Sequence, residues 1–221
     1  MIKDPFNKPV LGLDEVGRGP LAGPVVATGV YFSAPNKKLK TFYHKLGITD
    51  SKKITHIKRQ YILSELGIDT KALKKNRVYE LEHFSFCISE VSELEIDKIN
   101  ILQASLKAME KSLVKLIANI NINTCKVLID GNKPLKLNSK SASLFNKRKL
   151  NFEYVIGGDS KYLAIALASI IAKEYRDLLM KRLSKKFPDY QFEKHNGYPT
   201  KEHKNRIEKF GVLDVHRKTF K

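Results

Sequence analysis

The sequence predicts an α/β domain with a central β-sheet, helices on both faces and a small C-terminal helical subdomain. At 221 residues with 42% hydrophobic content, the chain is long enough to bury a large core. Strand-like segments come first and then alternate with helix-like segments, which is typical of this class. The tail is richer in turn residues, so we expect a core over 1–185 and a C-terminal segment over 186–221, within one domain overall.

Two strands are expected at 9–16 and 24–32, because both segments are rich in valine and aromatic side chains. Their connection is the glycine- and proline-containing segment GRGPLAG. Residues 33–53 contain six lysines and one acid, and predict a basic loop. A helix follows over about 56–66, with Thr55 as its N-cap.

Residues 78–90 alternate in part between apolar and polar side chains and predict a third strand. Ser92 to Glu95 read as a capping box. The helix after it has apolar residues every three or four positions over 101–117. The remaining expected elements are strands at 126–130 and 152–156, a helix at 161–184 capped by Ser160, and a short helix near 200–209.

The charge balance points to a polyanionic partner. The chain has 41 Lys+Arg against 23 Asp+Glu, a formal net charge of +18, which favours nucleic acid over an anionic membrane surface. The longest apolar run, YLAIALASIIA at 162–172, is too short to span a bilayer and predicts a buried helix. Without a signal-peptide pattern, and with Cys87 and Cys125 in no zinc spacing, we expect a cytoplasmic protein with two buried thiols.

Acidic residues recur where predicted strands end. Asp14 and Glu15 end the first strand, Asp130 ends the 126–130 strand, and Asp159 follows the 152–156 strand after two glycines. Because strand ends gather at one edge of an α/β sheet, we expect these acids to converge. Carboxylates without histidine or thiol ligands favour Mg²⁺ or Mn²⁺, and two such ions could assist phosphodiester hydrolysis. For each acid taken alone, a solvated strand end is the simpler explanation.

The two adjacent acids pose a geometric problem. Neighbouring residues of a strand point to opposite faces, so Asp14 and Glu15 cannot both reach one ion from a regular strand. We therefore expect the strand to end or bulge at this point, next to Gly17.

Several ordered blocks of the chain resemble bacterial ribonuclease HII, the type 2 ribonuclease H. The resemblance implies an RNase H-like fold, with a central mixed sheet flanked by helices and a C-terminal helical segment that helps to hold substrate. It implies cleavage of RNA in RNA–DNA hybrids, and cleavage on the 5′ side of single ribonucleotides in duplex DNA. The matching blocks are LGLDEVGRGPLAGPVVA at 11–27, DSKKIT at 50–55, EIDKINILQASLKAM at 95–109, IDGN at 129–132, GGDSKYLAIALASIIAKEYRD at 157–177, FPDYQFEKHNGYPTKEH at 187–203 and HRKTF at 216–220.

The resemblance also assigns roles to single residues. The metal-binding acids of the family fall on Asp14, Glu15, Asp130 and Asp159. A Gly-Arg-Gly triplet surrounds the ribose 2′-hydroxyl, which is the group that distinguishes RNA from DNA. A tyrosine packs on the neighbouring deoxyribose, and other positions contact phosphate or lie in the AS-x-x-AK segment. The implied substrate-binding residues are Gly17, Arg18, Gly19, Lys52, Ser169, Lys173 and Tyr198.

The four acids and the Gly-Arg-Gly triplet argue against three alternative functions. A non-catalytic nucleic-acid-binding module would not need four carboxylates, because they repel phosphate. Ribonuclease HIII normally has Gly-Thr-Gly and an added N-terminal domain, whereas this chain has Arg18 and few residues before the first strand. Another RNase H-fold nuclease, such as a resolvase or transposase, would lack the triplet. We therefore expect a monomeric ribonuclease H acting on RNA–DNA hybrid and ribonucleotide-containing duplex DNA.

Departures from the family are few. Ala166 and Leu167 replace a more common Ser-Ala pair, and the 33–49 loop is longer than usual.

The roles of other residues rest on weaker patterns. The basic stretch 133–149 is either a duplex contact or a solvated loop. We expect Asp177 to pair with Arg176 or a helix neighbour, and Tyr154 and Tyr175 to lie in the core. Three histidines of the tail are expected to be structural rather than proton shuttles, namely His195, His203 and His216.

Overall fold

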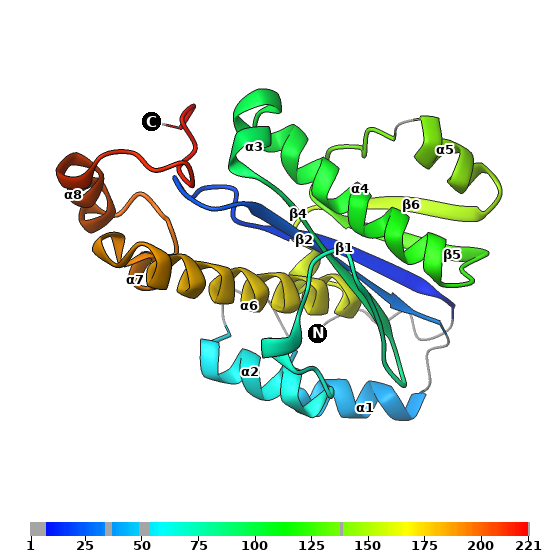
Figure 1. Cartoon of the computed structure of the whole chain (residues 1–221). Helices are drawn as coiled ribbons and strands as arrows, with labels where there is room; N and C mark the ends of the chain where they lie inside the picture. The colour runs from blue at the N-terminus through cyan, green and yellow to red at the C-terminus, as the bar shows by residue number, and fades with distance from the viewer. Residues whose placement is uncertain (1–7, 34–36, 49–53, 138, 221) are drawn as a thin grey trace.

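A computed structural model describes residues 8–33, 37–48, 54–137 and 139–220. Its centre is a six-stranded mixed sheet in the order β3-β4-β2-β1-β5-β6 (Figure 1), which confirms the predicted fold class. β1 pairs antiparallel with β2 and parallel with β5, and β6 extends the parallel part. The strands are β1 Val10–Val16, β2 Val25–Phe32, β3 Val78–Glu80, β4 Ser85–Val91, β5 Thr124–Asp130 and β6 Lys149–Val155.

Helices cover both faces of the sheet (Figure 1). The long helix α6 packs on β1 and β2 from one face, and α4 packs on β2 and β4 from the other. Of the described helices, none is long and apolar enough to cross a membrane. The helices are α1 Lys37–Leu46, α2 His56–Glu65, α3 Glu93–Ile99, α4 Ile101–Asn119, α5 Ser139–Asn146, α6 Leu163–Lys186, α7 Phe192–His195 and α8 Lys201–Phe210.

Alternation along β1 divides the core into two layers. Val10 packs in the cluster under α6, whereas Leu11 and Leu13 pack in the cluster under α4. Gly12 faces α6 at very short range, because a Cβ there would lie 2.3 Å from the carbonyl carbon of Ala164. The glycine therefore lets the start of α6 approach the sheet closely and sets the height of α6 above β1.

The lysine-rich segment 33–53 is not all loop, because it contains α1. Tyr43 and Leu46 are buried in the core, and Phe42 packs against it. Apolar side chains three and four positions apart thus give this helix a buried face, which the many lysines obscure in the sequence.

Two predicted elements are interrupted. The expected strand 78–90 folds into the hairpin β3–β4, closed by a hydrogen bond from Leu81 N–H to the carbonyl of Phe84. The helical region after Ser92 divides at Asn100, which has a φ of 65°. Asn100 then caps α4, because its side chain accepts a hydrogen bond from the N–H of Gln103.

The expected side-chain caps at two serines are also wrong. Ser92 is the N-cap residue of α3, but its side chain makes no capping hydrogen bond. Ser160 belongs to a 3-10 turn, Gly158–Ser160 (η3), and α6 begins later, with Tyr162 as its N-cap.

The basic stretch 133–149 contains α5 and is therefore not a plain loop. At its end, Arg148 donates hydrogen bonds to the carbonyls of Ile117, Ile122 and Leu144. This arginine ties the stretch to α4 and to the segment before β5, which is a structural role.

The C-terminal elements surround a small apolar cluster of their own. Tyr190 and Phe192 pack there against Met180 of α6 and Ala22 of the β1–β2 connection. Backbone hydrogen bonds join Leu21 N–H to the carbonyl of Gly197 and Gly23 N–H to that of Val215. The tail is thus attached directly to the segment that connects the first two strands.

Candidate active site

One cleft of about 330 Å³ lies at the carboxyl ends of the parallel strands β1 and β5. Strand ends, η3, α6 and the segment before α8 all contribute side chains to it. It includes every expected site residue except Lys52, which lies outside the described residues. The cleft is lined by Asp14, Glu15, Val16, Gly17, Arg18, Gly19, Asp130, Asp159, Ser169, Lys173 and Tyr198.

β1 ends at Val16, next to Gly17, but it stays regular through both adjacent acids, so a break or bulge at the acids themselves is wrong. Asp14 points toward α6, where Ser169 forms a side-chain hydrogen bond with it. Glu15 points toward α4 and lines a neighbouring pocket with Met109. Both acids still reach one cleft, because β5 ends at Asp130 and leaves that side of β1 open.

The carboxylates of the cleft are electrostatically strained. Burial raises the pKa of Asp14 well above its usual value, and the charges of Glu15 and Asp130 raise it further. Burial also raises the pKa of Glu15, although Arg18 Nη1, 3.4 Å from Glu15 Oε1, lowers it. Asp130 Oδ1 accepts a hydrogen bond of 2.6 Å from Gly158 N–H. Keeping Asp14 and Glu15 ionised therefore costs free energy, which a bound cation would relieve.

The donor set of the cleft suits a hard cation. Its acids offer only carboxylate oxygens, the ligands that Mg²⁺ and Mn²⁺ prefer. Glu15 Oε2 is buried and has no hydrogen-bond partner among the described residues. The four acids all belong to the described part of the chain, and no three of them place ligand atoms within 4.8 Å of one another.

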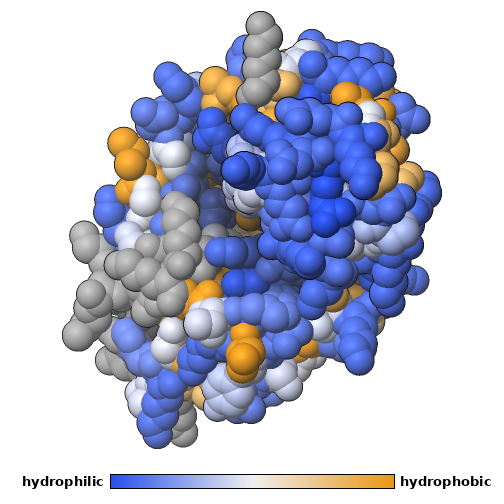
Figure 2. All heavy atoms as spheres, turned by 90° about the vertical axis from the view of Figure 1, so that its left-hand side faces the viewer, coloured by the Kyte–Doolittle hydropathy of each residue, from blue (hydrophilic) through white to orange (hydrophobic). Residues whose placement is uncertain are grey.

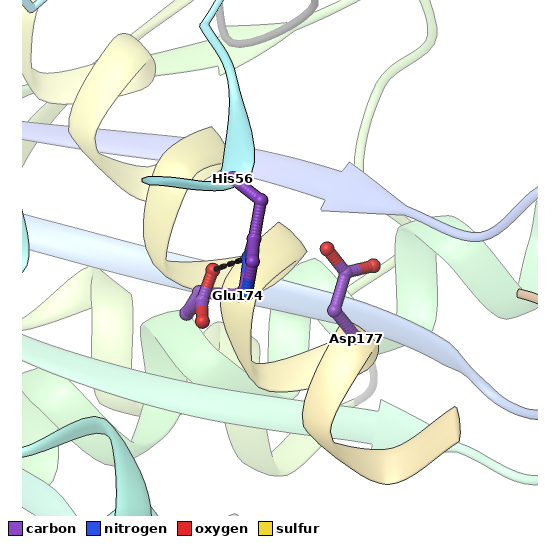
Figure 3. Close-up of side chains that lie close together, drawn as sticks. All are labelled: His56, Glu174 and Asp177. Atoms are coloured by element: carbon purple, nitrogen blue, oxygen red, sulfur yellow. Dashed lines mark hydrogen bonds and ion pairs between the residues drawn. The ribbon is translucent and has the colours of Figure 1, made fainter. Parts of the chain in front are cut away.

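A second group of ligand-type side chains lies between α2 and α6 (Figure 3). His56 Nδ1 is 3.1 Å from Glu174 Oε2, and Arg59 Nε is 3.5 Å from the same oxygen. Arg59 Nη2 also lies 2.5 Å from Asp177 Oδ2. Because one guanidinium already forms ion pairs with both carboxylates, we interpret the group as an ion-pair network that joins α2 to α6, not as a metal site. Asp177 therefore pairs with another helix, and not with Arg176 or a neighbour on its own helix.

The two glycines of the triplet differ in how much space the structure leaves for a side chain. Gly17 has a φ of 91°, and a Cβ there would lie 2.3 Å from Arg176 Nε, so no other residue fits without displacement. A Cβ on Gly19 would make an ordinary contact of 3.6 Å with the Tyr198 ring. Arg18 lies between them with about half of its side chain exposed. The triplet thus presents one half-exposed cation and two compact backbone positions to the cleft.

Tyr198 stands on a loop that buried histidines hold. Its N–H donates to the carbonyl of His195 at 2.9 Å, and its carbonyl lies 3.0 Å from His203 Nδ1. His203 Nε2 in turn meets His216 Nε2 at 3.2 Å, and all three rings are buried. Tyr198 itself remains 43% exposed, so its side chain is available at the edge of the cleft.

The hydrogen bonds of these rings require neutral histidines. His216 Nδ1 accepts from Leu213 N–H, so its Nε2 bears the proton and donates to His203. His203 Nδ1 then donates to the carbonyl of Tyr198. Burial lowers the pKa of His203 to about 4 and lowers those of His195 and His216 as well. These features fit the expected structural role of the three histidines.

Sequence reasoning missed two residues beside the cleft. Arg176 and Arg217 are buried and donate hydrogen bonds to carbonyls of the segment 17–24. Both lie within blocks that resemble ribonuclease HII, but nothing local separates them from the other basic residues. Their partners lie far away along the chain, so only their membership of those blocks could have drawn attention to them.

The remaining expectations concern side chains away from the cleft. Tyr175 is buried, as are the thiols of Cys87 and Cys125, as expected. Tyr154 is 37% exposed, so its assignment to the core is wrong. It lies on β6, an edge strand, which leaves part of its ring uncovered.

Comparisons with known proteins agree with this architecture. The family model "Ribonuclease HII" matches residues 11–221. The ribonuclease HII of Francisella tularensis subsp. novicida is 41% identical over 212 residues, which is 96% of each chain. That of Francisella philomiragia is 42% identical over 212 residues, again 96% of each chain.

Solved structures show the same fold. The Archaeoglobus fulgidus PCNA:RNase HII complex contains a chain with a TM-score of 0.68 and 22% identity, and the match covers 96% of this chain and 95% of that one. The ribonuclease H2 of Pyrococcus horikoshii has a TM-score of 0.67 and 24% identity, with 96% and 94% covered. A Bst-RNase HIII in complex with Mn²⁺ has a TM-score of 0.60 and 16% identity, with 92% and 70% covered.

The family model and the curated relatives both name ribonuclease HII rather than ribonuclease HIII, and both cover most of the sequence. These matches also favour an enzyme over the non-catalytic binding module. The chain therefore belongs to the ribonuclease HII family.

Proposed function

We propose that this ribonuclease H cuts the RNA strand of RNA–DNA hybrids and also cuts on the 5′ side of a single ribonucleotide in duplex DNA. One observation supports this most strongly: four carboxylates share one cleft with the triplet 17–19 and Tyr198. Carboxylates that suit a cation thus lie beside the triplet and a tyrosine, which suit a sugar. A nuclease that ignored the sugar would not need this second set of residues.

We propose that Asp14, Glu15, Asp130 and Asp159 hold Mg²⁺ or Mn²⁺, with two ions at full occupancy. The unpartnered Glu15 Oε2 and the all-carboxylate donor set support this. The related Bst-RNase HIII binds Mn²⁺ in a similar fold, which is consistent with the proposal. When bound, such ions lower the pKa of an attacking water and stabilise the leaving oxygen.

The protein's own groups orient these acids. Glu15 N–H donates to Asp14 Oδ1 at 2.7 Å, and Gly158 N–H donates to Asp130 Oδ1 at 2.6 Å. Each of these two carboxylates therefore has one oxygen held by the backbone. Lys173 brings a positive side chain to the same cleft, where it attracts the phosphate of the substrate.

The sugar-recognition part consists of Gly17, Arg18, Gly19 and Tyr198. Backbone donors of the triplet suit the ribose 2′-hydroxyl, and selection by hydrogen bonds to a hydroxyl is steep. Tyr198 packs on the next sugar with the exposed part of its ring. This pair of contacts would recognise a ribonucleotide that is followed by a deoxyribonucleotide.

The duplex lies across a basic and hydrophilic face. Figure 2 shows that the face on the side of the molecule where α7 and α8 lie is largely hydrophilic, although Phe210 and Val212 are exposed in this region. We propose that the segment 186–221 is the substrate-binding part, because exposed lysines are frequent there. Within the described part of this segment, the exposed lysines are Lys186, Lys194, Lys201, Lys204, Lys209 and Lys218.

A nicking assay on three duplexes tests the proposal. One contains a single ribonucleotide, one is a continuous RNA–DNA hybrid, and one is all DNA. We expect the enzyme to cut the first two duplexes with Mg²⁺ or Mn²⁺ and to lose this activity when EDTA is added. It should not cut the all-DNA duplex. Tyr198→Ala should slow cutting at the single ribonucleotide more than cutting of the hybrid, which has no deoxyribose neighbour. Efficient cutting of all-DNA duplex by the wild type would contradict the sugar-recognition role.

A further inference from the structure

Two buried arginines lie directly behind the triplet. Arg217 donates from Nη2 to the carbonyl of Gly17 at 2.6 Å and from Nη1 to that of Arg18 at 3.0 Å. Its Nε and Nη2 also reach the carbonyl of Gly23, at 2.9 Å and 2.7 Å. One guanidinium therefore holds both ends of the connection between β1 and β2.

Arg176 links this connection to the loop that bears Tyr198. It donates to the carbonyls of Ala22 and Asn196, each at 3.0 Å, and to that of Pro24 at 3.3 Å. Asn196 lies two residues before Tyr198. The spacing between the triplet and the tyrosine thus depends on this side chain.

Two charges are buried here without a salt bridge. Among the described residues, neither Arg176 nor Arg217 forms an ion pair with a carboxylate, and each is only 2% exposed. The carboxylate of Glu93 attracts both guanidinium groups, although it forms an ion pair with neither. Burying a cation without a direct ion pair is costly, so packing alone is a poor explanation for two such arginines. A guanidinium, however, offers five donors in a fixed plane, which suits several carbonyls at once.

The hydrogen bonds of Arg217 determine where the triplet's N–H groups point. A peptide unit is planar and trans, so its N–H points opposite to its carbonyl. The carbonyls of Gly17 and Arg18 face Arg217, so the N–H groups of Arg18 and Gly19 face away from it. Neither N–H has a hydrogen-bond partner within the described part of the chain, and both residues line the cleft.

We propose that Arg217 and Arg176 are positioning residues for ribose recognition. Arg217 directs the N–H groups of Arg18 and Gly19 toward the sugar, and Arg176 sets the distance from this pair to Tyr198. The inference rests on the proposed function, because it assigns the support of its sugar-recognition part.

The chain offers a matched control for the test. Arg148 also donates to three backbone carbonyls, but it joins α4 and α5 and lies outside the cleft lining. The variants are Arg217→Gln, Arg217→Lys, Arg176→Lys and Arg148→Gln. Thermal stability, kcat and KM are measured for each on the three duplexes described above.

Arg217→Gln should lower kcat/KM roughly a hundredfold on both ribonucleotide-containing duplexes, since small misplacements cost this much. Its preference for ribonucleotide over all-DNA duplex should fall as well. Arg217→Lys should not rescue the loss, because one ammonium cannot contact three carbonyls in a plane. Arg176→Lys should affect the single-ribonucleotide duplex more than the hybrid. Arg148→Gln should lower stability but leave kcat/KM within about twofold of wild type on either substrate.

Two outcomes would overturn the inference: unchanged kcat/KM and ribose preference in Arg217→Gln, or an equal loss in Arg148→Gln at matched stability. If Arg217→Gln does not fold, the test is Arg176→Lys, whose loss of kcat/KM is compared between the single-ribonucleotide duplex and the hybrid. An equal loss on the two duplexes would reject the inference. The selectivity of the wild type distinguishes a failure of the positioning role from a failure of the proposed function. A wild type that does not distinguish ribonucleotide from all-DNA duplex refutes the function itself, whereas normal wild-type selectivity with normal variants refutes only the positioning role.

Discussion

Acidification should destabilise the C-terminal region through its buried histidines. His203 is fully buried between His195 and His216, and its hydrogen bonds are satisfied only when all three rings are neutral. Burial lowers the pKa of His203 from 6.5 to about 4, and the charges of the neighbouring rings act in the same direction. The folded state therefore binds the proton more weakly than the unfolded chain does.

The sign and size of the effect follow from linkage. A histidine whose pKa is lowered on folding contributes stability above the unfolded pKa, and the contribution is lost as pH falls toward the folded pKa. Each factor of ten in proton affinity corresponds to about 1.4 kcal/mol, so His203 alone should reduce the free energy of unfolding by roughly 3 kcal/mol by about pH 4. At about pH 5 the loss should be roughly 2 kcal/mol. His195 and His216 should add to it, because their pKa values are lowered too.

Urea unfolding at several pH values between about 7.5 and 5 measures this directly. Carboxylates also titrate toward the lower end, so the comparison is made with His203→Asn, whose amide can still donate to the carbonyl of Tyr198. The variant will be less stable at neutral pH, but its stability should fall less steeply as pH decreases. Equal slopes for wild type and variant would refute the assignment of a neutral, buried His203.

Three further predictions concern the cleft, the sheet and the surface. Asp130→Asn should nearly abolish nicking, because the proposed metal site loses a carboxylate. Duplex affinity should be kept, because one less negative charge repels phosphate; normal turnover in a nicking assay would exclude Asp130 as a metal ligand. Gly12→Ala should lower the free energy of unfolding by roughly 2 kcal/mol or more, because the new Cβ meets backbone atoms of Ala164; unchanged stability in urea would show that α6 can move away. If six or more cations contact phosphates, duplex affinity should fall roughly a thousandfold between about 50 and 200 mM salt; a flat salt dependence in a binding assay would exclude the basic face.

Features that depend on local pattern could be predicted from the amino-acid sequence alone. Valine-rich segments indicated β1 and β2. Apolar spacing indicated α4, because burial of one helix face leaves its period in the sequence, and an uninterrupted apolar run indicated the buried helix α6. Acids at successive strand ends indicated a shared cleft, because the carboxyl ends of parallel strands meet at one edge. The resemblance to ribonuclease HII extended this to residues such as Arg18 and Tyr198, which no periodicity could single out.

Contacts between distant parts of the chain could be learned only from the three-dimensional arrangement. Asp177 pairs with Arg59 rather than with its own helix, and Arg217 reaches the triplet from the opposite end of the sequence. β1 stays regular through both acids because the end of β5, not a bulge, opens the space beside it. The helix α1 also escaped notice, because its apolar face is short and lysines surround it. Such contacts depend on distance in space, and a residue leaves no local trace of a partner more than a hundred positions away.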